Sequence, residues 1–354
     1  MKLSVCLIVK NEERVLGRCL ACAARIADEL IVVDTGSSDG SVAIARQYTP
    51  HVYLHPWQNS FAEARNYAYS KATCDYMMWL DADDVIAEDD LRRFQRLKET
   101  CPADTDVVFT LYRNYSEDGI TTYILRDRII RRALSPKCEG DAHEAIPMRP
   151  EWKCRYETGI TIIHKKEYVN EPHRNMDIFD RNIREKKAMT SYEKINYCKE
   201  LVLAGRGGEA YRVFRELRET VSPSGYYYAL YFLTRALLRQ GEYEACLRET
   251  EELERRMPTT ALMVYIQGLC HEAQGRREAA KQCYLRAMTV GEDPTTLYIQ
   301  DTGYTDYFPL LRLAEIAARE GDRHTAMDCI GRAAALYPRH EAWRQTRITV
   351  LLLA

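Results

Sequence analysis

The chain has 354 residues, with 50 Lys and Arg against 52 Asp and Glu. This length predicts two domains, and the balanced charge gives no indication of a nucleic-acid partner or of an anionic surface as a partner. No apolar run approaches the roughly 20 residues that span a bilayer, and the apolar start ends at Lys10 without a cleavage site. We therefore expect a cytoplasmic protein without a transmembrane segment, in which most of the 12 cysteines are reduced.

The first part of the chain alternates strand and helix patterns. Residues 3–9 and 29–33 are apolar runs typical of strands that are buried on both faces of a sheet. A helix opened by Asn11 is expected after the first run, and another over residues 42–47 after the second. Residues 50–54 predict a third, shorter strand. This order predicts an open, mostly parallel α/β sheet.

The stretch from Tyr76 to Leu80 predicts a further buried strand, and Asp81, Asp83 and Asp84 follow it directly. Open α/β sheets bind ligands at the carboxyl ends of their strands, so these carboxylates are expected to face a site. Carboxylates this close repel one another unless a cation lies between them, and hard oxygen ligands suit Mn²⁺ or Mg²⁺. The alternative is a solvated turn in which Asp84 or Asp89 caps the next helix.

Four motifs together resemble the family 2 glycosyltransferases of the GT-A fold. They are Val-Lys-Asn-Glu-Glu at 9–13, Val-Asp-Thr-Gly-Ser-Ser-Asp-Gly-Ser at 33–41, Ala-Arg-Asn at 64–66 and Leu-Asp-Ala-Asp-Asp at 80–84. The resemblance covers roughly the first 170 residues. It implies a Rossmann-like domain, a UDP-sugar donor, and Mn²⁺ or Mg²⁺ bound to the donor's diphosphate.

The resemblance also implies which residues bind the nucleotide sugar: Val9, Asn11, Glu12, Asp34, Arg65, Asp81 and Asp83. Among these, Asp34 is implied to contact the base or ribose, and Arg65 the nucleotide or diphosphate. Asp81 is implied to approach the ribose or the metal, and Asp83 to bind the metal directly.

Further candidates follow in the next strands, which are expected at 106–112 and, as two short strands, over 123–132. His164 ends an apolar run, and by the same resemblance it completes the metal site, for which neutral imidazole is suitable. Inverting transfer, which the resemblance implies, needs a general base. Glu144 is the first candidate and Asp141 the second, and the sequence leaves open which of them points inward.

The second half of the chain predicts helical repeats. Gly205, Gly241, Gly275 and Gly321 each end an apolar helical pattern, and a small residue follows each glycine by five positions: Ala210, Cys246, Ala280 and Ala326. The first two intervals, 241−205 = 36 and 275−241 = 34 residues, lie near the 34-residue tetratricopeptide (TPR) period. About four TPR-like repeats are expected, with an insertion over 294–307 in the longer third interval.

These patterns predict a GT-A domain over 1–170, a charged helical linker over 171–194 and an all-α TPR-like domain over 195–354. The expected function is metal-dependent inverting transfer of a sugar from a UDP-sugar to a peptide or protein acceptor held partly by the repeats. A saccharide or lipid-linked envelope glycan is an alternative acceptor. A non-catalytic scaffold with a degenerate donor site is an alternative of another class, and the repeats could also form a homodimer.

Overall fold

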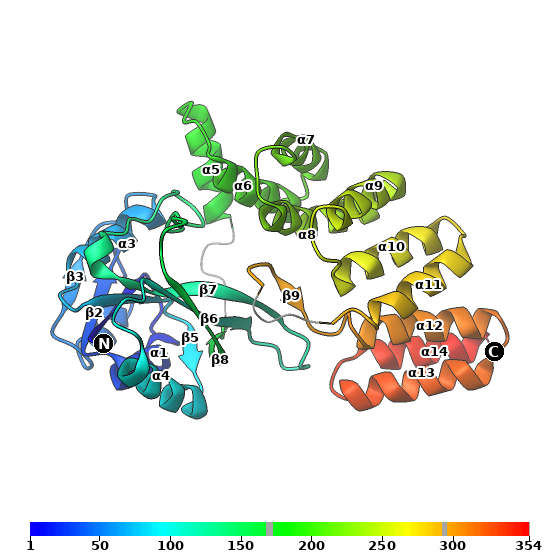
Figure 1. Cartoon of the computed structure of the whole chain (residues 1–354), viewed down its shortest axis with the longest axis horizontal. Coiled ribbons are helices and arrows are strands. Elements are labelled where there is room, and N and C mark those ends of the chain that lie inside the picture. Colours follow the sequence, from blue (N-terminus) through cyan, green and yellow to red (C-terminus); the bar gives the residue numbers. More distant parts are fainter. Residues whose placement is uncertain (168–172, 292–295, 354) are drawn as a thin grey trace. The chain divides into compact units, whose positions relative to one another are not determined.

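The computed structural model describes residues 1–167, 173–291 and 296–353, and Figure 1 shows its elements. These residues form two compact units. The first consists mainly of residues 1–115 and the described part of 124–189, and the second of 116–123, 190–291 and 298–353. The predicted boundary at residue 170 lies outside the described residues, and the boundary at 194 stays a prediction.

The strands form a mixed sheet in the order β3-β2-β1-β4-β7-β6-β8-β5. The four strands β3, β2, β1 and β4 are parallel, so their carboxyl ends lie at one edge, whereas β7 is antiparallel to β4. Strand β9 pairs with residues 122–123 of β7. The bounds are β1 (Leu3–Val9), β2 (Glu29–Asp34), β3 (Val52–Leu54), β4 (Tyr76–Leu80), β5 (Asp84–Ile86), β6 (Val107–Asn114), β7 (Thr122–Arg131), β8 (Cys154–His164) and β9 (Gln300–Asp301).

The first unit also contains helices, several of which pack against strands of this sheet. Their bounds are α1 (Leu16–Ile26), α2 (Ser41–Ala45), α3 (Phe61–Ser70), α4 (Glu88–Thr100), α5 (Arg174–Arg184) and the 3₁₀ helix η1 (Arg132–Leu134). The apolar stripe of α1, which includes Leu16, Leu20 and Ala23, is fully buried in the same core as β1, β2 and β4. Apolar burial of this kind is the main contribution to stability.

Local differences from the expected elements have physical reasons. The first helix begins at Leu16, because Asn11 has a left-handed φ of 55° and its amide donates to the Ser37 hydroxyl at 2.9 Å. One continuous strand, β7, replaces the two expected ones. The helix after the acidic turn starts after Ala87 with no side-chain cap, so neither Asp84 nor Asp89 has the capping role.

The second unit is built from antiparallel helix pairs, which Figure 1 shows in succession from α6 to α13, followed by α14. Their bounds are α6 (Ser191–Leu203), α7 (Gly207–Leu217), α8 (Pro223–Gln240), α9 (Tyr243–Glu254), α10 (Ala261–Ala273), α11 (Arg277–Ala287), α12 (Tyr307–Arg319), α13 (Arg323–Leu336) and α14 (Ala342–Leu353). The predicted fold class, a GT-A-like α/β domain followed by TPR-like helices, is confirmed.

The periodic glycines and small residues have the roles that the repeat pattern requires. The glycines at 205, 241, 275 and 321 all have φ between 74° and 80°, the left-handed conformation that ends a helix most easily without a Cβ atom. The small residues five positions later are all fully buried. A small side chain there lets the two helices of a pair approach closely.

Residues 116–123, which comprise most of the connection from β6 and the first two residues of β7, belong to the second unit. Ile120 packs against the core that contains Tyr307 and Leu310. The Thr121 amide donates to the Thr302 hydroxyl at 2.8 Å, and the Tyr123 hydroxyl donates to Gln300 at 3.0 Å. This segment, which we call the β6–β7 tip, is therefore part of the repeat core.

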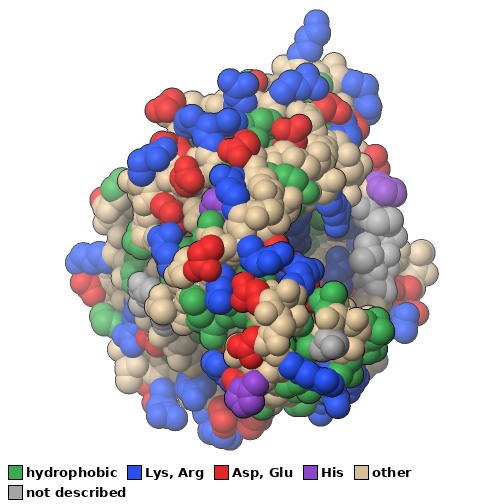
Figure 2. Space-filling model, turned by 90° about the vertical axis from the view of Figure 1, so that its right-hand side faces the viewer, with side chains coloured by type: hydrophobic (Ala, Val, Ile, Leu, Met, Phe, Trp, Pro, Cys, Tyr) green, Lys and Arg blue, Asp and Glu red, His purple; other side chains and the backbone are tan. Residues whose placement is uncertain are grey.

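Charged side chains of both signs are mixed on the face in Figure 2, without one broad patch of either sign. This distribution matches the balanced composition. Among the residues that the structure describes, no helix combines the length and apolar character needed to cross a bilayer.

Gly268 provides a test of the repeat packing. A Cβ atom at this position in α10 would lie 2.5 Å from the ring of Tyr284, which is fully buried on α11. We therefore expect Gly268→Ala to lower the free energy of unfolding by about 1–3 kcal/mol through overpacking, although alanine is the better helix former. Urea denaturation measures the change.

Gly331→Ala is the matched control. Gly331 also lies inside a helix, α13, but its added Cβ would meet nothing within 4 Å. Only the higher helix propensity of alanine affects this position, so the free energy of unfolding of the control should rise by up to about 1 kcal/mol. Equal effects of the two substitutions would contradict the packing described for α10 and α11.

Candidate active site

The acidic residues after β4 form a closed turn. The Asp84 amide donates to the Asp81 carbonyl oxygen at 3.0 Å, and the Asp81 amide donates to Asp84 Oδ2 at 3.0 Å. Antiparallel pairing of β5 with β8 then sets Asp84 opposite His164. Two stretches that are 80 residues apart in the sequence therefore meet at the carboxyl ends of the parallel strands.

His164 binds two carboxylates of this turn. Its Nδ1 lies 3.1 Å from Asp83 Oδ1 and 3.3 Å from Asp84 Oδ1. Burial by itself lowers the pKa of His164, but the hydrogen bonds to Asp83 and Asp84, together with their charges, raise it to about 10. Without a metal, His164 is thus an imidazolium that compensates part of the acidic charge.

Arg65 on α3 joins the turn to the loop after β7. Its Nε donates to Glu144 Oε1 at 2.7 Å, and its Nη2 donates to Asp81 Oδ1 at 3.2 Å. The Arg65 side chain is only 5% exposed, and its Nη1 is buried without a hydrogen-bond partner among the described residues. A buried guanidinium with an unused donor is suited to an anionic ligand such as a phosphate.

A second arginine lies beneath the turn. Arg128 on β7 donates to Asp84 Oδ2 at 3.3 Å, and both side chains are fully buried. The Tyr112 hydroxyl donates to Asp84 Oδ1 at 3.1 Å. Burial raises the pKa of Asp84, while the charge of Arg128 opposes that rise.

The charges of this cluster suit a divalent cation. Four carboxylates, those of Asp81, Asp83, Asp84 and Glu144, face three cations, the guanidinium groups of Arg65 and Arg128 and the imidazolium of His164, so negative charge remains in excess. Ligand atoms of Asp81, Asp84 and His164 lie within 4.8 Å of one another. Carboxylate oxygens with one imidazole are an appropriate donor set for Mn²⁺, and the oxygens alone for Mg²⁺.

The residues expected at the nucleotide lie at the ends of β1 and β2. Asp34 is 4% exposed, and its Oδ2 accepts from the amides of Gly36 and Ser37, each at 3.0 Å. Its Oδ1 is buried and has no hydrogen-bond partner among the described residues. An orphaned buried acceptor costs free energy, so a donor from a ligand would stabilise this site.

Three neighbours of Asp34 hold the two loops together. The Val9 carbonyl accepts from the Thr35 amide at 2.9 Å. Asn11 Oδ1 accepts from the Ser38 amide at 2.8 Å, and the Glu12 amide donates to the Ser41 hydroxyl at 2.8 Å. These contacts give Val9, Asn11 and Glu12 a part in shaping the loop around Asp34.

The two candidate bases have different surroundings. Glu144 contacts Arg65 in the acidic cluster, whereas Asp141 Oδ2 accepts from Asn182 at 2.9 Å and lies 3.2 Å from Arg181 Nη2 on α5. Burial tends to raise the pKa of Asp141, but hydrogen bonds from Ser60 and Asn182 and the charge of Lys187 hold it below its usual range. Asp141 thus attaches α5 to the loop before Glu144.

The structure brings one set of predicted residues into a continuous contact network: Arg65, Asp81, Asp83, Glu144 and His164. Asp34 and its neighbours lie on the adjoining strand ends, and Asp141 contacts α5. Sequence reasoning missed Tyr112 and Arg128 and gave Asp84 no separate role. A signal for Arg128 was present, since an arginine within an apolar strand needs a buried counter-charge.

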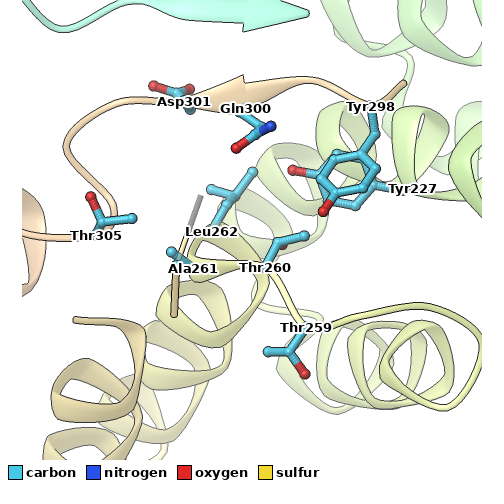
Figure 3. A pocket seen from close by; sticks show the side chains of 10 residues that line it. Tyr227, Thr259, Thr260, Ala261, Leu262, Tyr298, Gln300, Asp301 and Thr305 are labelled. Atoms are coloured by element: carbon cyan, nitrogen blue, oxygen red, sulfur yellow. The ribbon is translucent and has the colours of Figure 1, made fainter. Parts of the chain in front are cut away.

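A small pocket lies in the second unit, apart from the predicted site residues. It is formed by the start of α10, by Tyr227 of α8 and by the segment around β9, and Figure 3 shows Tyr227 and Tyr298 side by side in it. Their ring centroids are 5.0 Å apart. Tyr226, Tyr227 and Tyr307 are buried as repeat core.

The sheet topology and the carboxylate-rich turn at its edge define a GT-A-like domain. Residues 4–152 match the family model described as "Glycosyl transferase family 2". The N-terminal part of the chain is therefore similar to glycosyl transferase family 2, and the resemblance predicted from the four motifs is confirmed.

Two sequence relatives are named for one or the other of these features. A TPR repeat-containing protein of Synechococcus elongatus is 32% identical over 41% of this chain, which spans 35% of that relative. The SPbeta prophage-derived glycosyltransferase SunS of Bacillus subtilis is 32% identical over 23% of this chain and 20% of its own length. A solved structure of glucosyl-3-phosphoglycerate synthase from Mycobacterium tuberculosis aligns at 22% identity with a TM-score of 0.28, over 32% of this chain and 44% of that one. The chain thus spans about a third or less of the two sequence relatives.

Arg65→Met tests the ion-pair network. It leaves Asp81 and Glu144 without their shared cation in a largely buried site, so the free energy of unfolding should fall by about 3 kcal/mol. Arg92→Met is the control, because Arg92 pairs with Glu88 while 54% exposed and should change stability by less than about 1 kcal/mol. Urea denaturation measures the free energy of unfolding of both variants. Similarly small losses of stability in the two would contradict a buried ion-pair network.

Proposed function

We propose that this chain is a metal-dependent inverting glycosyltransferase that moves a sugar from a UDP-sugar to a peptide or protein acceptor. The observation that carries the proposal is Arg65, which hydrogen-bonds both Asp81 of the acidic turn and Glu144 within a family 2 domain. One buried cation thereby joins the carboxylates suited to a metal and the carboxylate suited to a base.

Two buried polar atoms that have no hydrogen-bond partner among the described residues support the proposed donor site. Asp34 Oδ1 can accept a hydrogen bond from a ring N–H or a ribose hydroxyl, and Arg65 Nη1 can donate to a diphosphate oxygen. Asp81, Asp83 and His164 would hold Mn²⁺ or Mg²⁺. A bound cation would neutralise charge on the departing nucleoside diphosphate.

Glu144 is proposed as the general base. The acceptor O–H or S–H gives its proton to a Glu144 oxygen while the acceptor atom bonds to the anomeric carbon. At the same time the bond from that carbon to the diphosphate oxygen breaks, and the nucleoside diphosphate takes the electron pair. Single displacement of this kind inverts the anomeric centre, and the second carboxylate Asp141 is engaged with α5 instead.

The TPR-like repeats support a peptide or protein acceptor, because stacked helix pairs expose an extended surface that suits such ligands. A relative that is 32% identical over 145 residues is named for its TPR repeats, which supports the assignment of the second half as repeats. A saccharide acceptor is the competing outcome in an acceptor screen.

Asp83→Asn tests the metal and donor assignment. UDP release from a panel of UDP-sugars with Mn²⁺ should occur for one donor with the unmodified chain and stop with a chelator. Asp83→Asn should lower it by at least about 100-fold, since the metal loses a charged ligand. Asp89→Asn is the matched control, because Asp89 is 70% exposed and its ion-pair partner among the described residues is the surface residue Arg92.

Full activity of Asp83→Asn would remove Asp83 from the metal site. Absence of UDP release by the unmodified chain, together with absence of calorimetric UDP binding, would instead favour the scaffold function. Release of a different nucleotide from its sugar donor would still support a glycosyltransferase, but it would show that the donor nucleotide is not UDP.

Glu144→Gln tests the base. The substituted amide keeps the shape of the side chain and can still accept from Arg65, so UDP binding should remain within about twofold, whereas transfer should fall by about 100-fold or more. The comparison variant Asp141→Asn should keep most of the transfer rate. The opposite result would assign the base to Asp141.

A further inference from the structure

Arg128 is a fully buried arginine that lies under the acidic turn. Its Nη1 donates to Asp84 Oδ2 at 3.3 Å and to the Trp79 carbonyl oxygen at 3.2 Å. Neither the Arg128 nor the Asp84 side chain is exposed. A charge pair removed this completely from water is retained only where its partners are close to each other and fixed.

Two aromatic rings fix the guanidinium group of Arg128. Its Cζ atom lies 3.5 Å from the ring centroid of Trp79 and 4.1 Å from that of Tyr112. A planar guanidinium can stack on aromatic rings and donate at its edge at the same time, which the compact ammonium of lysine cannot do. The position therefore requires arginine and not simply a positive charge.

Asp84 transmits this constraint to the turn above it. The same oxygen that accepts from Arg128, Oδ2, also accepts from the Asp81 amide at 3.0 Å. The other oxygen accepts from the Tyr112 hydroxyl. Arg128 and Tyr112 thus hold Asp84, and Asp84 holds the backbone at Asp81.

We propose that Arg128, together with Tyr112, is a positioning residue for the metal site: through Asp84 it fixes the Asp81–Asp84 turn so that Asp81 and Asp83 face the cation. This inference rests on the proposed function and gives Asp84 a supporting role. Outer partners of metal ligands typically change metal affinity by 10–100-fold when they are removed.

Arg128→Lys is the test, with Mn²⁺ affinity as the readout, measured by electron paramagnetic resonance of free Mn²⁺ in the presence of saturating UDP. The variant keeps the charge and loses the planar guanidinium that stacks on Trp79 and Tyr112 while its Nη1 donates to Asp84, so the dissociation constant for Mn²⁺ should rise by about tenfold. Calorimetric binding of UDP without metal should stay within about twofold, because Asp34 lies on other strands.

Arg131→Lys separates positioning from general stability. Arg131 lies on the same strand and pairs with Asp106 at 3.0 Å, but it is opposite Tyr76, at the other end of β4 from the acidic turn. The Arg131→Lys substitution should lower the melting temperature while leaving the Mn²⁺ dissociation constant unchanged. A purely structural Arg128 would behave in the same way as this control.

Unchanged Mn²⁺ affinity in folded Arg128→Lys overturns the inference and leaves the proposed function intact. If Arg128→Lys does not fold, Tyr112→Phe replaces it, because it removes the contacts of the hydroxyl with Asp84 at 3.1 Å and with Asp81 at 3.4 Å without unpairing the buried charges. Weaker Mn²⁺ binding by Tyr112→Phe then supports the inference, and unchanged binding overturns it. Absence of Mn²⁺ binding by the unmodified chain overturns the metal assignment and this inference together.

Discussion

The acidic turn after β4 depends on compensation of negative charge away from water. Parallel strands bring Asp81, Asp83 and Asp84 to one edge of the sheet, and a low local dielectric makes their repulsion strong. The positive charges of Arg65 on α3 and Arg128 on β7 offset this repulsion. The positions of α3, β4 and β7 are thus linked through these charges, and not only through the apolar core.

The fold could be predicted from the sequence because its signals are local and repeated. Apolar runs mark β1, β2 and β4, and recurring glycines mark the helix pairs. The element bounds were less predictable where side chains of one loop bind the backbone of another. Asn11 is an example, since its left-handed conformation depends on contacts with Ser37 and Ser38, about 26 residues further on.

The site could be predicted only in part, for a related reason. Motif residues such as Asp83 and Arg65 are recognisable by their neighbours in the sequence. The pairing of Arg65 with Glu144 spans 79 residues, and that of Asp84 with Arg128 spans 44. Such pairs depend on strand order and register, which one sequence does not specify. The residues that touch a ligand were therefore easier to predict than the residues that support them.

The β6–β7 tip has a consequence for how the chain can be divided. Its residues 116–123 follow β6 and include the start of β7, but they contribute Ile120 to the repeat core. Cleavage at the 189–190 junction would give a sheet fragment carrying a piece of the repeat core and a repeat fragment with a gap where Ile120 packs. The two units are thus interleaved along the gene, and separately expressed halves would each be structurally incomplete.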